Sequence, residues 1–368
     1  MSKPLLSVCL IAYNQAQYVQ EAIDTILAQK VNFPWELIIA DDCSTDGTKE
    51  ILLEYKQKYP NFIKLILQRS NVGPESNWLD LMAYPKSKYV LYGEGDDYFS
   101  DPTKLQRQVD FLESHDNFSI CFHPVKVIHE DGSRPHEVFP TPQLRHNKTV
   151  LDLSDLLAGN FIQTNSAMYR WRFVEKNIKD VFPRNIAPGD WFLHILHAQV
   201  GKIGFINRVM AVYRRHDKSL WWAASNEEFW EKNGLAHLGM YAEVLKLCGD
   251  KAELKDAIYI VISQAFLALA GLKDANSEKS VLYRVFLQYP QMSTELFVRL
   301  FKDADDTLNL NKLIKGQEEQ IQKLKELNNG QEEHIHGLER AMLNITESRA
   351  WKKIEQIRRV RAKLRGKI

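Results

Sequence analysis

Residues 89–99 read YVLYGEGDDYF, and this stretch decides how the rest of the chain is interpreted. An apolar and aromatic run over 89–92 is followed at once by Glu94, Asp96 and Asp97. Ligands of open α/β sheets bind beyond the carboxyl ends of the strands, so acids directly after a buried strand mark a site. The stretch therefore predicts a strand over 89–92 with a polar site at its end.

The same pattern occurs twice nearer the amino end. Residues 5–12 are almost continuously apolar, and residues 37–40 run straight into Asp41 and Asp42. Between the two runs, apolar residues of 18–27 recur at helical spacing. Strands that alternate with helices in this way predict an α/β fold with a mostly parallel sheet covered by helices.

Beyond residue 117 the predicted elements are mixed. Residues 118–123 and 125–128 have the composition of strands, whereas 133–149 hold three prolines and are expected to form a loop. A helix is expected to open at Asp190, and from 227 to 301 the pattern is helical throughout.

Composition excludes several classes of protein. The chain has 368 residues, of which 45% are hydrophobic and 26% charged, which is typical of globular domains and not of disordered or collagen-like chains. Its four cysteines lie far apart, so we expect a reducing compartment and neither a zinc site nor a disulfide framework. No apolar run has the length of a membrane span or the flanks of a signal peptide, so we expect a soluble or peripheral cytoplasmic protein.

The acids after the strands point to a cation. Clustered carboxylates such as Glu94, Asp96 and Asp97 repel one another unless a cation or hydrogen-bond donors neutralise them. Mg²⁺ is typically held by one or two carboxylates together with substrate phosphates, so the pattern indicates a metal-bridged diphosphate site. Each acidic pair taken alone is also explained by helix capping and loop solvation.

The order and spacing of these motifs resembles the family 2 inverting glycosyltransferases with the GT-A fold. The matching segments are residues 6–14, 40–48 (ADDCSTDGT), 71–73 with Asn77, 93–99 (GEGDDYF) and the acceptor-side motif Gly-Asp-Trp at 189–191. The resemblance covers about residues 4–217 and does not extend to the helical region or the tail.

The resemblance implies a role for each donor-side residue. Tyr13 corresponds to the aromatic residue that packs on the nucleotide base, Asp41 and Asp42 to the acids that hydrogen-bond the base and ribose, and Asn71 to a further donor-binding position. Glu94-Gly95-Asp96 resembles the DxD motif, with Asp96 as ligand of Mg²⁺ or Mn²⁺ and Asp97 beside the donor sugar. Glu94 departs from the family's first Asp, and its longer side chain is assigned to the donor.

The later motifs supply the remaining roles. Asp190 is the candidate general base, with helix capping as the alternative. His216 is the candidate second metal ligand, with an ordinary loop histidine as the alternative. Arg214 and Arg215 could contact a phosphate, or they could be an ordinary pair of solvated charges. Trp221 and Trp222, which complete this set, suit either a sugar acceptor or packing.

The carboxyl end changes character. Ile314, Ile321, Asn328, Ile335 and Met342 lie seven residues apart and predict an oligomeric coiled coil, although one long amphipathic helix folded onto the body fits as well. Residues 349–368 contain nine Lys and Arg and one acid, within a chain of net charge +1. Apolar residues three or four apart among these basic ones predict an amphipathic helix, and we expect an anionic membrane surface as its partner, although a solvated helix fits as well. Because the rest of the chain is net acidic, we expect no nucleic-acid partner.

These expectations combine into one architecture and function. The predicted parts are a GT-A domain over 1–217, a helical domain over 218–305, a coiled coil over 306–346 and a basic amphipathic tail over 347–368. The resemblance implies an inverting, metal-dependent glycosyltransferase that moves a sugar from a nucleotide-sugar donor to a glycan or lipid-linked acceptor, at the inner face of the plasma membrane. A nucleotidyltransferase is a second interpretation, and a non-catalytic scaffold with a vestigial sugar-nucleotide fold is a third.

Overall fold

The chain divides into two compact units, Met1–Trp222 and Ala223–Ile368. The computed structural model describes residues 3–132, 134–217, 225–273, 275, 277 and 279–300. The predicted coiled coil, the basic tail and the pair Trp221 and Trp222 lie outside the described residues.

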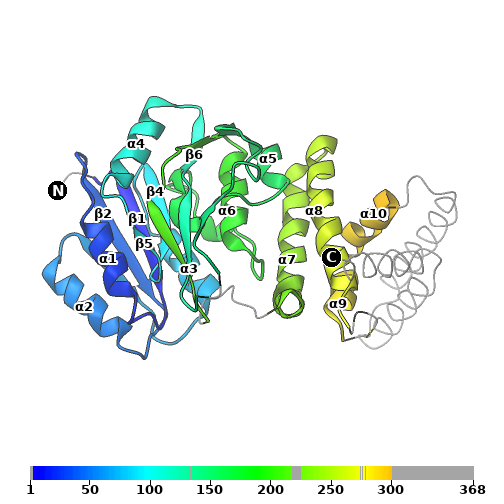
Figure 1. The fold of residues 1–368 in the computed structure, drawn as a ribbon, viewed down its shortest axis with the longest axis horizontal. Helices are drawn as coiled ribbons and strands as arrows, with labels where there is room; N and C mark the ends of the chain where they lie inside the picture. Colours follow the sequence, from blue (N-terminus) through cyan, green and yellow to red (C-terminus); the bar gives the residue numbers. More distant parts are fainter. Residues whose placement is uncertain are drawn as a thin grey trace. The chain divides into compact units, whose positions relative to one another are not determined.

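A central sheet organises the first unit (Figure 1). In its described residues, eight strands pair in the order β3-β2-β1-β4-β10-β6-β11-β9. The strands are β1 Leu6–Ala12, β2 Trp35–Asp41, β3 Ile63–Leu67, β4 Tyr89–Glu94, β6 Phe118–Phe122, β9 Val150–Leu151, β10 Met168–Arg170 and β11 Lys202–Phe205. The α/β class predicted from the sequence is confirmed, because β3, β2, β1 and β4 are mutually parallel.

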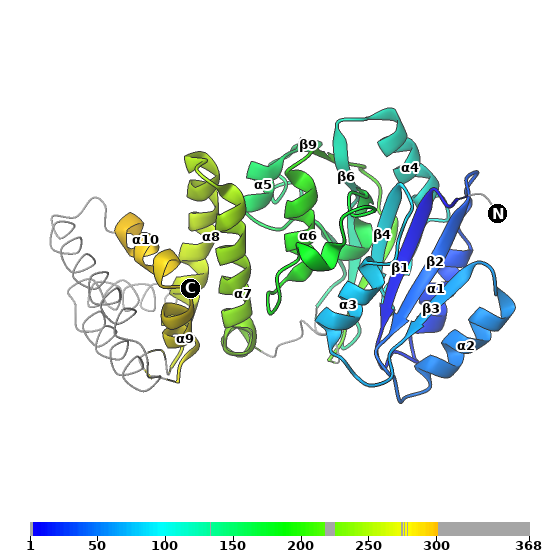
Figure 2. The same cartoon turned by 180° about the vertical axis from the view of Figure 1, so that it is seen from behind.

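Helices cover both faces of this sheet (Figures 1 and 2). They are α1 Val19–Leu27, α2 Thr48–Lys58, α3 Pro74–Met82, α4 Lys104–Ser114, α5 Leu153–Leu157 and α6 Gly189–Ala198, with 3₁₀ turns η1 Thr164–Ser166 and η2 Ile178–Asp180. Val19, Ala22, Ile23 and Ile26 of α1 are buried at helical spacing against alternate residues of β1. Trp78 of α3 contacts Tyr92 on the opposite face of the sheet.

One reversal in the sheet is decisive for the site. β10 runs antiparallel to both β4 and β6, and Met168 pairs with Leu91 while Arg170 pairs with Tyr89. The chain that enters β10 therefore lies at the carboxyl end of β4. The 3₁₀ turn η1 consequently reaches the end of the sheet where Glu94 closes β4 and Asp96 and Asp97 follow it.

A smaller sheet closes the first unit beside α1. It has the order β5-β12-β7-β8, with β5 Tyr98–Phe99, β7 Val125–His129, β8 Glu137–Phe139 and β12 Ala211–Arg215. The expectation of a loop throughout 133–149 was wrong at β8, since Glu137–Phe139 pairs with the edge of β7. α4 begins at Lys104, after a turn in which Asp101 accepts hydrogen bonds from the backbone N–H and the hydroxyl of Thr103.

The second unit is helical in its described residues, as the sequence predicts. Its helices are α7 Asn226–Cys248, α8 Ala252–Ala270, α9 Val281–Gln288 and α10 Pro290–Leu300. Gly234 lets α7 approach its neighbours, because a Cβ there would lie 2.7 Å from Leu269 and 3.1 Å from Val281. Among the described residues, no helix combines the length and apolar character needed to cross a bilayer.

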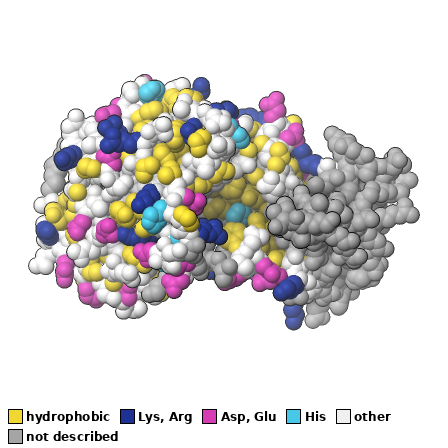
Figure 3. Space-filling model, viewed as in Figure 1, with side chains coloured by type: hydrophobic (Ala, Val, Ile, Leu, Met, Phe, Trp, Pro, Cys, Tyr) yellow, Lys and Arg dark blue, Asp and Glu magenta, His cyan; other side chains and the backbone are white. Residues whose placement is uncertain are grey.

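Charged side chains of both signs lie on the surface of the first unit. On the face shown in Figure 3, basic and acidic side chains are interspersed over the first unit. The excess of basic over acidic residues occurs in the last twenty residues of the sequence, which lie outside the described part.

Close packing between β11 and α4 generates a stability test. A Cβ at Gly204 would lie 2.2 Å from Phe111 Cζ and 3.1 Å from Phe118 Cδ1. We therefore predict that Gly204→Ala lowers the free energy of unfolding by about 1–3 kcal/mol, because the aromatic rings must shift. Gly159→Ala is the matched control, since nothing lies within 4 Å of its added methyl. Equal urea midpoints for the two variants would contradict the packing described here.

Candidate functional site

Three strand ends meet at one edge of the sheet. β1 lies between β2 and β4, with Ala12 opposite Asp41 and Ile11 opposite Glu94. Neighbouring strands lie about 4.8 Å apart, so Asp41 and Glu94 are separated by about 10 Å across β1. The fold thus gathers acids from two separate motifs at the carboxyl ends of parallel strands.

The turn after β4 is folded back onto β1. Gly95 N–H donates to Ile11 O at 2.9 Å, and Asp97 N–H donates to Glu94 O at 3.2 Å. A Cβ at Gly95 would lie 2.4 Å from Gln15 Oε1 and 3.3 Å from Ile11 O. A methyl group at this position would require the Gln15 side chain to move and the turn that carries the acids to shift by a few tenths of an ångström from Ile11 O.

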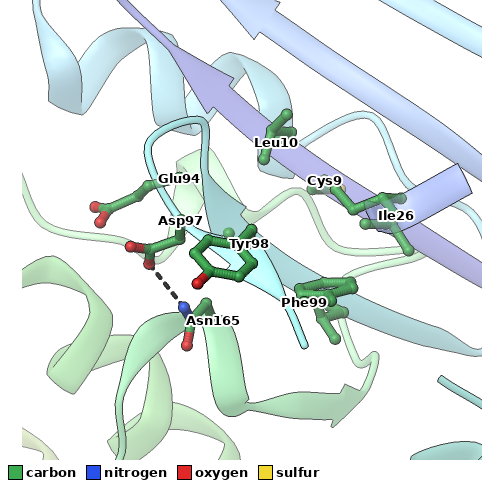
Figure 4. Close-up of a pocket in the computed structure, with 11 residues that line it drawn as sticks. Cys9, Leu10, Ile26, Glu94, Asp97, Tyr98, Phe99 and Asn165 are labelled. Carbon is green, nitrogen blue, oxygen red and sulfur yellow. Dashed lines mark hydrogen bonds between the residues drawn. The ribbon is translucent and has the colours of Figure 1, made fainter. Parts of the chain in front are cut away.

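Asp97 is held inside this turn (Figure 4). Its carboxylate accepts hydrogen bonds from Asn165 Nδ2 at 2.8 Å and from Arg214 N–H at 3.0 Å. Burial, followed by the charges of Asp96 and Glu94, raises the pKa of Asp97 well above its usual range. The predicted place of Asp97 beside the donor sugar stays a prediction, and both its oxygens already have protein donors.

Asp96 and His216 are brought together. His216 Nε2 lies 3.0 Å from Asp96 Oδ2, and the His216 ring stacks on Tyr18 with ring centroids 4.9 Å apart. Both residues are more than nine-tenths buried. Asp96 Oδ1 is buried and has no hydrogen-bond partner within the described residues. An unpaired carboxylate oxygen next to an imidazole is a donor set that suits a divalent cation.

The protein alone does not complete such a centre. Within the residues that the structure describes, no three His, Cys, Asp or Glu side chains converge closely enough to hold a metal ion. Asp96 and His216 fit the two-ligand arrangement in which phosphate oxygens of a bound substrate supply the remaining contacts.

Asp190 lies in the first turn of α6. Its Oδ1 accepts from Trp191 N–H and its Oδ2 from the Thr164 hydroxyl, both at 2.7 Å. Burial raises the pKa of Asp190, and these hydrogen bonds oppose the rise. The helix begins at Gly189 after Pro188, so Asp190 is inside the helix and not the residue before it.

Glu94 connects the two groups of acids electrostatically. Burial, and then the charges of Asp96 and Asp190, raise the pKa of Glu94 to about 8. Tyr92, two residues earlier on the same face of β4, also has its pKa raised by burial and by the same three acids. Glu94, Asp96 and Asp190 therefore share one poorly solvated region.

The remaining donor-side candidates lie around the end of β2. Asp41 accepts from Ser44 N–H at 3.0 Å and from the Ser44 hydroxyl, and Asp42 accepts from Val72 N–H at 2.7 Å. Asn71 is exposed and accepts from Gly73 N–H. Tyr13 is 47% exposed, which leaves its ring accessible for stacking. Both Asp residues thus have loop-forming hydrogen bonds, and neither caps α2 or α3.

Arg214 has internal partners. Its guanidinium pairs with Glu21 and, at 3.4 Å, with Glu130, and it lies over the rings of Tyr18 and Tyr98. These contacts fix β12 against α1 and so hold His216, which follows the strand. A phosphate contact by Arg214 is not needed to explain its burial.

Sequence reasoning missed Thr164 and Asn165, which hold Asp190 and Asp97. Their only signal in the sequence is a polar pair placed shortly before the three-residue strand β10. The pair acquires its partners through the reversal of β10 described above.

The sequence is similar to those of known and putative glycosyltransferases. The family model described as Glycosyl transferase family 2 matches residues 7–178. The uncharacterized protein Rv1520 of Mycobacterium tuberculosis is 38% identical over 290 residues, covering 78% of this chain and 81% of its own. A Bacillus subtilis protein named "Putative teichuronic acid biosynthesis glycosyltransferase TuaG" is 29% identical over 160 residues, covering 44% of this chain and 60% of its own.

A solved structure is similar in fold. Staphylococcus aureus TarS 1-349, crystallised with UDP, superposes with a TM-score of 0.55 at 16% identity, covering 87% of this chain and 92% of its own. The family model, the long relative and the acids gathered at the sheet edge agree: the chain belongs to glycosyl transferase family 2 and is a glycosyltransferase.

Proposed function

We propose that this glycosyltransferase is inverting and divalent-cation-dependent, and that it transfers a sugar from a nucleotide-sugar, a UDP-sugar by preference, to a glycan or lipid-linked acceptor. The observation that carries the proposal is that consecutive residues of η1, Thr164 and Asn165, bind Asp190 and Asp97, so that Asp190 is held next to the acids at the end of β4. The UDP and UDP-GlcNAc bound in the TarS structures support the donor class. We assign the enzyme to cell-surface polysaccharide or lipopolysaccharide synthesis, and the name of TuaG, which refers to teichuronic acid biosynthesis, supports the polysaccharide part of this assignment.

In the proposed reaction the Asp190 carboxylate acts as general base. The acceptor hydroxyl oxygen forms a bond to the anomeric carbon of the donor sugar while its proton passes to Asp190. The bond between the anomeric carbon and the phosphate oxygen breaks, and its electron pair leaves with the nucleoside diphosphate. Attack opposite the leaving group inverts the anomeric carbon, so no carboxylate nucleophile is required.

Donor binding is assigned to the ends of β1, β2 and β4. The exposed Tyr13 ring would stack on the base, and Asp41, Asp42 and Asn71 would line the nucleoside side. Glu94 lies across β1 from Asp41, within the span of a ribose and its diphosphate. Asp41 and Asp42 are buried, which strengthens their polar contacts with the donor.

A divalent cation, Mg²⁺ or Mn²⁺, would be held by Asp96 and His216. The 3.0 Å approach of the two side chains and the unpaired Asp96 Oδ1 support this assignment. When bound, the cation would stabilise the negative charge that develops on the departing diphosphate.

The carboxyl-terminal parts are assigned partners on sequence alone. The proposed domain limits remain 1–217, 218–305, 306–346 and 347–368. The coiled coil would form a homo-oligomer, and the basic tail would hold the enzyme at an anionic membrane surface on the cytoplasmic side, near lipid-linked acceptors.

The base assignment predicts a specific loss. Asp190→Asn keeps the hydrogen-bonding shape but removes proton acceptance, so sugar transfer should fall by about 10²–10⁴-fold. Donor affinity, measured by calorimetry, should change little because Asp190 is placed on the acceptor side. Asp116→Asn, at an exposed position, is the matched control and should transfer at the normal rate. Undiminished transfer by Asp190→Asn would rule out the base role.

The tight turn after β4 predicts a second loss. Gly95→Ala should reduce donor and cation binding, because its methyl would push the turn away from Gln15 and Ile11 O. Gly93→Ala is the matched control, since its Cβ would meet nothing closer than Leu10 Cδ1 at 3.9 Å. We expect at least about a tenfold weaker donor Kd for the first variant, equivalent to about 1.4 kcal/mol. Equal donor affinities would show that the turn does not need its observed shape.

A further inference from the structure

The 3₁₀ turn η1 joins the two groups of acids. The Thr164 hydroxyl donates to Asp190 Oδ2 at 2.7 Å, and the next residue, Asn165, donates from Nδ2 to Asp97 Oδ2 at 2.8 Å. Figure 4 shows the second of these bonds, with Asn165 directed at Asp97 beside Glu94. Two consecutive side chains thus bind a carboxylate on α6 and a carboxylate after β4.

The turn itself is firmly anchored. Thr164 is 5% exposed, and Asn165 and Ser166 are fully buried. Asn165 Nδ2 also donates to Val212 O of β12 at 3.0 Å, and Gln108 Nε2 of α4 donates to Ser166 O at 2.8 Å. Since the turn is fixed to β12 and α4, the Thr164 hydroxyl has a defined position that does not depend on α6.

Within the described residues, the Asp190 carboxylate accepts one hydrogen bond at each oxygen. Its Oδ1 accepts from Trp191 N–H of its own helix, and Thr164 is the donor that reaches it from another element. The hydroxyl occupies one lone pair of Oδ2 and leaves the other available to an acceptor proton. A general base must be held in reach of the proton that it removes, and small displacements are costly for the rate.

We propose that Thr164 is a positioning residue that orients the Asp190 carboxylate toward the acceptor hydroxyl through its own hydroxyl, with Asn165 anchoring the turn to the donor side. This inference rests on the proposed role of Asp190 as general base. According to this proposal, the buried turn η1, which precedes β10, sets the distance between the donor-side acids and the base.

The experiment compares three variants with and without the hydroxyl. Thr164→Val removes the hydroxyl at nearly constant shape, Thr164→Ala removes it without added bulk, and Thr164→Ser retains it. We expect kcat to fall by about ten- to a hundredfold in the first two, while the donor KM stays unchanged and the serine variant retains most of the activity. Thermal unfolding of each variant shows that the comparison is made on folded protein.

The pH profile separates orientation from general damage. A hydroxyl that donates to the ionised carboxylate lowers the pKa of Asp190, whereas burial raises it. Thr164→Val should therefore move the acid limb of the kcat/KM profile to higher pH, and Thr164→Ser should leave it in place. The titratable side chains whose charge interacts with Asp190, namely Glu94, Tyr92 and Tyr169, are unchanged in all variants.

Each remaining outcome has one meaning. Normal kcat in Thr164→Val and Thr164→Ala would overturn the proposal, as would an equal loss in the serine variant with an unmoved pH profile, which indicates a structural role. Asp190→Asn is assayed beside them to keep the two claims apart. If that variant is inactive while Thr164→Val is normal, only the positioning role fails. If Asp190→Asn transfers normally, the base assignment itself fails.

Discussion

Several carboxylates buried at one place are the constraint on which this site depends. Burial and the charges of neighbouring acids raise the pKa of Glu94 to about 8 and the pKa of Asp97 well above its usual range, and burial raises the pKa of Asp190. The fold compensates part of this cost with donors from Asn165, Arg214 and Thr164. It leaves Asp96 Oδ1 without one among the described residues. The uncompensated charge favours a cation and the diphosphate that accompanies it.

The sheet topology creates this concentration of charge. Parallel pairing of β2, β1 and β4 aligns their carboxyl ends, so Asp41 and Glu94 flank the same strand. Because β10 runs antiparallel to β4, η1 lies at the same end of the sheet, where its residue Thr164 binds Asp190 of α6. β12, paired in the second sheet, ends next to His216. Residues far apart in the chain are therefore held by backbone pairing and by a few buried hydrogen bonds, not by a continuous motif.

The sequence reveals the strand ends because position follows from pattern there. The apolar run 89–92 predicts a buried strand with acids at its end. In the structure β4 continues to Glu94, which is its last residue, and Asp96 follows it. The sequence does not reveal which carboxylate oxygens are already bonded. Asp97 is closed off by Asn165 and Arg214, contacts that depend on the course of β10 and β12. Short strands such as β8 and β10 also escape pattern reasoning, since three residues show no periodicity.

Calorimetric titration of the full chain with UDP, GDP, CDP and dTDP, each with MnCl₂ and with EDTA, tests the central claim most directly. If the buried acids form a cation and diphosphate site, at least one nucleotide binds about tenfold or more tightly with Mn²⁺, a gain of about 1.4 kcal/mol. Asp96→Asn should lose that gain and keep the metal-independent part. Equal binding with and without the cation, for every nucleotide that binds, would contradict the account.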